Sequence, residues 1–267
     1  MLGHVLVAAA ALGVADPSKP HPHRGVLDKY ERVHPSKYGL TLKGVGEDEL
    51  RSGKPLLRDI KLPNGYQRAT SVQDVPAPPE VVWDRIMDLE AYPRMVEGVT
   101  ACSIYRRSKS GRTQEVYAKY KAGAGPFNVE YFIRHDFEPS KNAMTFCLDY
   151  DRLSDFADTV GYWYVEKLED GWCRVYYSAE SKLPGWVPGW AKDQLCATAL
   201  KRSTSWVDRE CKQAMGLGGA RHSGGRIAAL RKFAMRAAAA AALAIFLKLP
   251  LPLVPSTVKL PLSKMSA

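Results

Sequence analysis

Tyrosines on predicted strands are the residues of this 267-residue chain whose type and spacing best suit ligand chemistry. Several segments between Thr100 and Ser181 alternate apolar and polar residues with period two, which is typical of half-buried strands. A tyrosine offers a ring for apolar contact and a hydroxyl that can orient an oxygen of a quinone, a sterol or a headgroup. These side chains either line a pocket for a hydrophobic ligand or fill a dry core. The candidates on the apolar faces are Tyr120, Tyr131, Ile133, Phe146, Leu148, Tyr162, Tyr164, Val175 and Tyr177.

No catalytic set accompanies these side chains. His135 lies on a predicted strand, but Asp136 follows it directly and therefore points to the opposite face. Glu130 and Asp136 fall on the polar face, outside any apolar pocket. The glycine-rich segment 123–126 joins two strands and lacks the lysine and the following helix that a phosphate-binding loop requires. We therefore expect binding rather than catalysis.

The cysteines and histidines give no sign of a metal site. The five cysteines contain no CxxC pair and are predicted to be small, buried, unreactive side chains. His21 and His23 stand among prolines without sequence partners. We expect no resident metal or cofactor, apart from a bound lipid or quinone.

The net charge of +10 is concentrated at the C-terminal end. Eight of the 38 basic residues lie after residue 220, where no acidic residue occurs. The preceding part therefore holds 30 basic against 28 acidic residues, which is nearly neutral. A protein that follows a phosphate backbone needs a basic excess in its folded part, so nucleic acid is not an expected partner.

The N-terminal region divides into two parts. Residues 1–15 are apolar and alanine-rich, and are interpreted as a cleaved signal, an uncleaved anchor or a helix docked on the domain. We expect a membrane-associated protein of an organelle or the endomembrane system. Residues 16–64 are rich in Pro, Lys, His and Gly, and are predicted to be an extended leader along the domain surface.

The order of the predicted elements indicates one α+β domain over residues 65–216. A strand ending at Val75 is followed by a helix, about six further antiparallel strands, and a long helix from Val187 to Met215. A sheet with one apolar face must bury it, and the only long helix comes last. We expect a curved sheet of about seven strands around that helix.

The segment from Val72 to Val99 carries a more specific motif. It follows the pattern V-x-A-P-x-E-x-V-W-x-x-L-x-D-x-E-x-Y-P, with isoleucine in place of leucine. The matching residues are Val75, Ala77, Pro78, Glu80, Val82, Trp83, Ile86, Asp88, Glu90, Tyr92 and Pro93. This pattern resembles the START-like superfamily of polyketide cyclases and lipid-transfer proteins, closest to the coenzyme-Q-binding branch. The resemblance covers about residues 66–215. It implies the helix-grip fold and a hydrophobic ligand.

Two further segments suggest membrane contact. Trp186 and Trp190 lie on a Pro/Gly-rich loop before the last helix, where they either gate the cavity at a membrane or plug one end of the core. Residues 217–267 form a basic, alanine-rich tail whose uncharged apolar run, 237–247, is short for a membrane span. We expect it to lie on a membrane surface, to dock on a protein partner or to span the bilayer. The predicted membrane contacts are Arg231, Lys232, Arg236 and Phe246.

Three functions follow from these patterns. The first is non-enzymatic binding, transfer or chaperoning of a lipid or isoprenoid quinone at a membrane. The second is an accessory subunit of a membrane complex, with the leader and tail as docking arms. The third, implied by the resemblance, is a cyclase or aromatase in which tyrosines and His135 orient a polyketone.

Overall fold

The computed structural model describes residues 15–40, 47–61, 67–124, 127–183 and 204–217. The chain divides into two compact units, residues 1–221 and 222–267, and the second unit lies outside the described residues. None of the described helices is long and apolar enough to cross a lipid bilayer.

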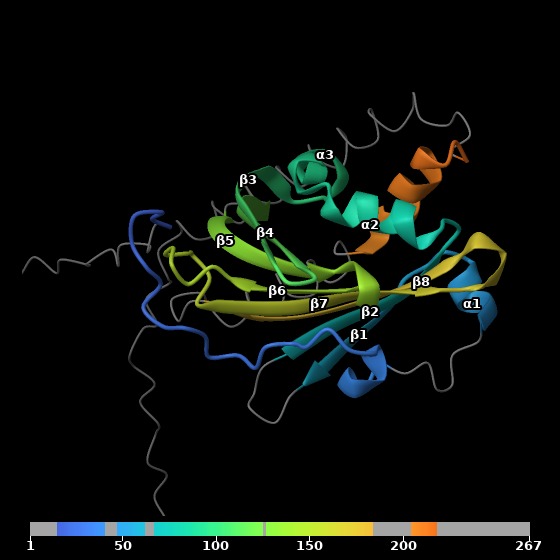
Figure 1. Cartoon of the computed structure of the whole chain (residues 1–267), viewed down its shortest axis with the longest axis horizontal. Coiled ribbons are helices and arrows are strands. Elements are labelled where there is room, and N and C mark those ends of the chain that lie inside the picture. Colours follow the sequence, from blue (N-terminus) through green and yellow to red (C-terminus); the bar gives the residue numbers. More distant parts are fainter. Residues whose placement is uncertain (1–14, 41–46, 62–66, 125–126, 184–203, 218–267) are drawn as a thin grey trace, which may run out of the picture. The chain divides into compact units, whose positions relative to one another are not determined.

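An eight-stranded, fully antiparallel sheet dominates the first unit (Figure 1). Its spatial order is β1-β2-β8-β7-β6-β5-β4-β3. The strands are β1 (Leu56–Lys61), β2 (Gln67–Val75), β3 (Val99–Ser110), β4 (Thr113–Ala124), β5 (Phe127–Glu138), β6 (Ala143–Leu148), β7 (Asp158–Lys167) and β8 (Cys173–Lys182). The sequence analysis expected about seven strands and did not include β1, which lies in the segment interpreted as leader.

The helices are short except at the C-terminal end of the domain. They are α1 (Glu47–Arg51), α2 (Pro79–Met87) and α3 (Tyr92–Met95), with 3₁₀ turns at Pro35–Tyr38, Leu89–Ala91, Pro139–Lys141 and Glu169–Gly171. Helix α2 begins at Pro79, since proline suits the first helical turn, where its missing N–H has no partner to lose. Residues 204–214 are helical and form the described end of the predicted last helix.

One side of the sheet, here called the helix-facing side, packs against α2 and the C-terminal helix. Val82 and Ile86 of α2 and Trp206 and Val207 of the C-terminal helix share one buried cluster with Val175 of β8. This arrangement of a curved antiparallel sheet around a C-terminal helix is the expected α+β helix-grip fold.

The other side of the sheet is covered by residues 15–40. From here on, the word leader refers to these residues only and no longer to the predicted segment 16–64. Leu27, Tyr30 and Leu40 of the leader share a buried cluster with Val160 and Tyr162 of β7. The leader runs across the outside of the sheet as an extended strap, blue in Figure 1. These residues lie along the sheet, and the assignment of the whole segment 16–64 as a leader stays a prediction. Both faces of the central strands are therefore buried.

Polar contacts fix the leader to the sheet and to the loop before β7. The buried carboxylate of Asp158 accepts hydrogen bonds from the backbone N–H groups of Val26 at 2.6 Å and Leu27 at 2.9 Å. The Tyr30 hydroxyl lies 2.8 Å from the Ser178 hydroxyl on β8. His21 Nε2 donates to the Phe156 carbonyl at 3.1 Å. These contacts make the leader part of the folded domain.

Candidate functional site

A cluster of aromatic rings covers the helix-facing side of β4 and β5. Tyr120 and Tyr131 are cross-strand partners whose rings stack with centroids 5.3 Å apart and planes 4° apart. Phe156, from the loop before β7, packs edge-on against Tyr131 at 4.9 Å. Tyr92 of α3 closes the other side, 6.1 Å from Tyr120. Strands, loop and helix thus converge on one aromatic surface.

A hydrogen-bonded pair sits at the base of this surface. His135 Nδ1 lies 3.2 Å from the carbonyl oxygen of Val116, which can only accept, so Nδ1 carries the proton of the neutral ring. Nε2 then accepts from the Tyr120 hydroxyl at 3.1 Å. Burial lowers the pKa of His135 from 6.5 to about 4, because the charged imidazolium is poorly solvated there. His135 is therefore neutral at pH 7, with both ring nitrogens occupied.

A second aromatic group continues the surface across β6, β7 and β8. Phe146 and Tyr177 lie 6.4 Å apart with planes at 22°, and Trp163 lies 4.6 Å from Tyr177. Gly161 faces Phe146 directly across the β6–β7 pairing. A Cβ atom at Gly161 would lie 1.9 Å from the Phe146 ring, so the ring occupies the space that any other residue would fill. Trp206 of the C-terminal helix lies 6.4 Å from Trp163.

Three aromatic side chains on this surface stay partly accessible. Tyr131, Phe146 and Tyr177 are half-buried, whereas Ile133 and Val175 on the same side are 4% and 1% exposed. Burial nevertheless raises the pKa of Tyr131 and of Tyr177. These rings lie deep in the protein yet keep accessible surface, as expected for side chains that a ligand can touch.

The structure brings most of the predicted lining residues to this side. Those placed there are Tyr120, Tyr131, Ile133, Phe146, Leu148, Val175 and Tyr177. Whether each contacts a ligand stays a prediction. The sequence analysis missed Tyr92, Phe156, Gly161 and Trp163. Trp163 and Gly161 could have been found from β7, where they occupy the alternate positions to the tyrosines that were chosen.

Tyr162 and Tyr164 were assigned to the wrong face. The Tyr162 ring stacks on Tyr30 of the leader at 5.9 Å, and its hydroxyl donates to the Val33 carbonyl. Tyr164 packs edge-on against His34 of the leader at 5.6 Å. Strand β7 is buried on both sides, so the periodicity of its apolar residues does not reveal which face meets the helix.

The predicted gate and membrane contacts cannot be placed. Trp186, Trp190, Arg231, Lys232, Arg236 and Phe246 lie outside the described residues.

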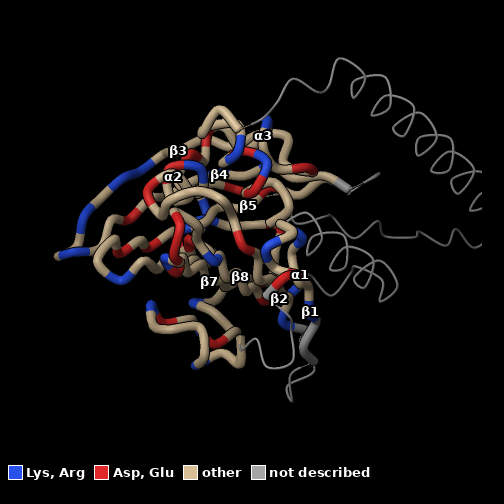
Figure 2. The backbone as a smooth tube through the Cα atoms, turned by 90° about the vertical axis from the view of Figure 1, so that its right-hand side faces the viewer, with Lys and Arg blue, Asp and Glu red and all other residues tan. Residues whose placement is uncertain are grey.

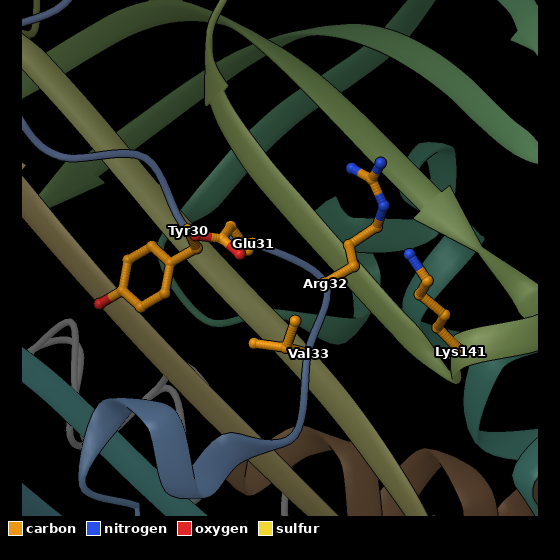
Figure 3. A pocket seen from close by; sticks show the side chains of 5 residues that line it. All are labelled: Tyr30, Glu31, Arg32, Val33 and Lys141. Carbon is orange, nitrogen blue, oxygen red and sulfur yellow. The ribbon is translucent and has the colours of Figure 1, made fainter.

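A surface pocket of about 310 Å³ lies beside the leader and is lined by Tyr30, Glu31, Arg32, Val33 and Lys141 (Figure 3). Its basic groups are already engaged, since Arg32 and Lys141 both contact Glu138, at 3.3 and 3.1 Å. This pocket belongs to the attachment of the leader and differs in character from the aromatic surface.

Acidic and basic side chains are scarce on the aromatic surface. Of the described residues on the helix-facing side of β4 to β8, His135 is the only His, Asp, Glu, Lys or Arg besides Lys167 at the exposed end of β7. The nearby Cys102 thiol has its pKa raised to about 12 by burial and is protonated at neutral pH. The described part of the chain holds no cluster of three His, Cys, Asp or Glu placed to bind a metal. The surface therefore offers aromatic contact and neutral hydrogen-bonding groups.

Residues 75–204 match the family model described as polyketide cyclase / dehydrase and lipid transport. The match runs from the last residue of β2 to the first described residue of the C-terminal helix. This part of the chain is similar to that family. The matched segment holds the aromatic side chains of the sheet together with Tyr92 and Phe156, whereas β1, the leader and Trp206 lie outside the match. The match does not distinguish the coenzyme-Q-binding branch expected from the motif.

Solved structures similar to the domain include both functional types that the family description names. The Zhui aromatase/cyclase of Streptomyces sp. R1128 is 14% identical, with 58% of this chain and 99% of that chain covered and a TM-score of 0.48. A START superfamily protein of Mycobacterium smegmatis is 17% identical, with 56% and 99% covered and a TM-score of 0.48. A STAR-related lipid transfer protein of Xanthomonas axonopodis is 15% identical, with 58% and 98% covered and a TM-score of 0.47. No curated protein matches the chain in sequence.

Proposed function

We propose that the domain binds a neutral hydrophobic molecule, a lipid or an isoprenoid quinone, against the helix-facing side of its sheet and does not transform it. The family and the fold fit the binding of hydrophobic ligands. One observation carries the proposal: half-buried Tyr131, Phe146 and Tyr177 lie on a surface whose central acid–base group, His135, is neutral and hydrogen-bonded at both nitrogens. Apolar contact at about 25 cal/mol per Å² would supply most of the affinity.

The charge of the surface favours a neutral ligand over a charged one. A carboxylate or phosphate buried there would lose its hydration, which is costly, and the one cation among the described residues on this side of β4 to β8 is Lys167 at the exposed end of β7. A carbonyl or hydroxyl oxygen, in contrast, could accept a hydrogen bond from a tyrosine hydroxyl. We infer that a ligand headgroup in contact with this surface is uncharged. The basic tail would hold the domain near the membrane from which such a ligand is taken.

A cyclase-like enzyme is the second candidate, because Tyr120 and His135 form a hydrogen-bonded polar pair on the surface. General acid–base catalysis works best when the catalytic pKa lies near the operating pH. The pKa of His135, about 4, and the occupied Nε2 make it a weak base at pH 7. This geometry favours binding over catalysis.

The test is ligand recovery followed by titration. The full chain is purified without detergent, extracted with organic solvent, and the extract is analysed by mass spectrometry. Delipidated protein is then titrated with a lipid and with a quinone. We expect a hydrophobic molecule in the extract and saturable binding of at least one probe. Protein that carries no hydrophobic molecule and binds neither probe would contradict the proposal.

Two tyrosine variants locate the site. Tyr177→Ala removes a half-buried ring from the helix-facing side, whereas the control Tyr164→Ala removes a half-buried ring from the leader-facing side. Loss of roughly 1–2 kcal/mol of aromatic contact corresponds to a weakening of about 5- to 30-fold for Tyr177→Ala, with little change for the control. Equal weakening by both would refute the location. Turnover of a polyketone by wild-type protein, lost in His135→Gln, would favour the enzyme instead.

A further inference from the structure

The hairpin of β3 and β4 carries an unusual group of basic side chains. Between Gly98 and Gln114 the sequence has four basic residues, Arg106, Arg107, Lys109 and Arg112, and no acidic one. All four are exposed, and β3 is the last strand at one edge of the sheet. Residues 106–112 are called the basic hairpin below. Blue segments in Figure 2 follow the arm of the sheet labelled β3.

Three of the four charges of the basic hairpin are not neutralised by a described carboxylate. Glu115, the nearest acidic residue in sequence, binds Arg134 at 2.9 Å and accepts a hydrogen bond from Ser108 at 2.7 Å. Arg107, Lys109 and Arg112 form no ion pair with any described carboxylate. Arg106 differs, because its guanidinium packs 3.5 Å from the centre of the Tyr117 ring.

Basic residues further along β4 are treated differently. Lys119 and Lys121 both contact Glu130, at 2.7 and 3.2 Å. These two lysines of β4 are therefore paired with a carboxylate, whereas Arg107, Lys109 and Arg112 are not. Because residues 1–220 hold nearly equal numbers of basic and acidic residues, the excess at the hairpin is local and does not reflect the composition of the domain.

We propose that the basic hairpin docks the domain on an anionic phospholipid surface. Each Lys or Arg close to such a surface contributes about 1 kcal/mol, so three free cations on one exposed hairpin make an effective contact. The edge position of β3 lets the hairpin approach a flat surface without obstruction by a neighbouring strand. The basic tail has the same sign of charge and would act on the same surface.

Charge complementarity alone also suits other polyanions, but the local shape favours a membrane. The excess is confined to one short hairpin and does not extend as a basic groove along the described surface, which binding to a nucleic acid strand requires. The inference rests on the proposed function only in that a membrane is the source of the hydrophobic ligand.

Vesicle co-sedimentation of the full chain tests the docking. The triple variant Arg107→Glu, Lys109→Glu, Arg112→Glu is compared with the control Arg24→Glu, Lys54→Glu, Lys167→Glu. The control changes three exposed basic residues spread over the rest of the domain, so both variants have the same net charge. Vesicles are phosphatidylcholine alone or phosphatidylcholine with phosphatidylserine, at low and at physiological salt.

We expect the wild type and the control to bind the phosphatidylserine vesicles, and the hairpin variant to bind at least about tenfold more weakly. Binding should fall as salt increases, since exposed charges are screened. An equal loss in both variants would show that only net charge matters and would overturn the proposal. Stronger binding of the wild type to duplex DNA or to an acidic polypeptide than to the vesicles would also overturn the proposal. Ligand titration without vesicles separates the two proposals, because the hairpin variant should keep its ligand affinity.

Discussion

The Tyr120 hydroxyl and His135 Nε2 lie 3.1 Å apart on adjacent strands, beneath the described aromatic surface. Because the other ring nitrogen binds the Val116 carbonyl, the pair has one consistent proton arrangement. The histidine is thereby held neutral and oriented, and a ligand would meet the phenyl ring of Tyr120 rather than a free base.

Tyr120→Phe should destabilise the domain by about 1–3 kcal/mol, because it leaves the buried Nε2 of His135 without a donor. Urea denaturation followed by circular dichroism measures the change. Tyr131→Phe is the matched control on the partner strand, where the hydroxyl of a half-buried residue is removed, and a change below about 0.5 kcal/mol is expected. Equal effects of the two variants would show that the Tyr120–His135 bond contributes nothing specific.

Stability should decrease as pH falls from 6.5 to about 4. In this window the unfolded chain binds a proton at His135 that the folded domain does not, so acid favours unfolding. The full effect of the shift from 6.5 to about 4 is on the order of 3 kcal/mol. Denaturation measured at several pH values should give a shallower slope for His135→Gln in this window, while any contribution of the carboxylates stays in both proteins. An unchanged slope would contradict the buried neutral histidine.

Gly161→Ala should destabilise the domain by about 1–3 kcal/mol, because the new methyl group would overlap the Phe146 ring. Phe146→Leu replaces the ring by a shorter aliphatic side chain and should relieve the overlap. In a double-mutant cycle, the double variant is expected to be more stable than the sum of the two single effects predicts. Additive behaviour would mean that the two residues do not share this space.

Asp158→Ala should loosen the leader. The substitution removes the acceptor for the backbone N–H groups of Val26 and Leu27 and for the Tyr150 hydroxyl, at a cost of about 3 kcal/mol or more for a buried carboxylate with several donors. Hydrogen exchange should accelerate at the Val26 and Leu27 amides. The control Asp28→Ala changes an exposed carboxylate in the leader and should leave exchange unchanged. Unchanged protection in Asp158→Ala would contradict the proposed attachment.

Much of the fold could be predicted from the sequence. The order of the predicted elements was confirmed, because each was signalled by nearby residues. Examples are the prolines before α2, the alternation along β5 and the small-residue turn after β3. Strand β1 was missed because its sequence, LLRDIK, lies in an aperiodic stretch and pairs only at the sheet edge. An edge strand half exposed to solvent carries a weak periodic signal.

The faces of the strands were harder to predict than the strands themselves. On β5, His135 and Tyr131 alternate with charged residues, so the helix-facing side was evident. On β7, Tyr162 and Trp163 are adjacent and both buried, and only the tertiary contact with Tyr30 decides which one meets the leader. The face predicted for Tyr162 and Tyr164 was therefore wrong, because a second layer covers that side of the sheet. That layer has no apolar periodicity of its own, because it is held through backbone N–H groups and isolated side chains.

Because the leader covers one side of the sheet, the part of the chain that must fold together is larger than the segment 75–204 that matches the family model. A fragment trimmed to the matched residues 75–204 would begin at the last residue of β2, so it would lack β1, most of β2 and the strap over Val160 and Tyr162. In such a fragment β8 would become an unpaired edge strand, and the apolar side chains that the leader covers would be exposed. The fragment would therefore be prone to aggregate. A fragment made to measure ligand binding should therefore begin no later than Ala15.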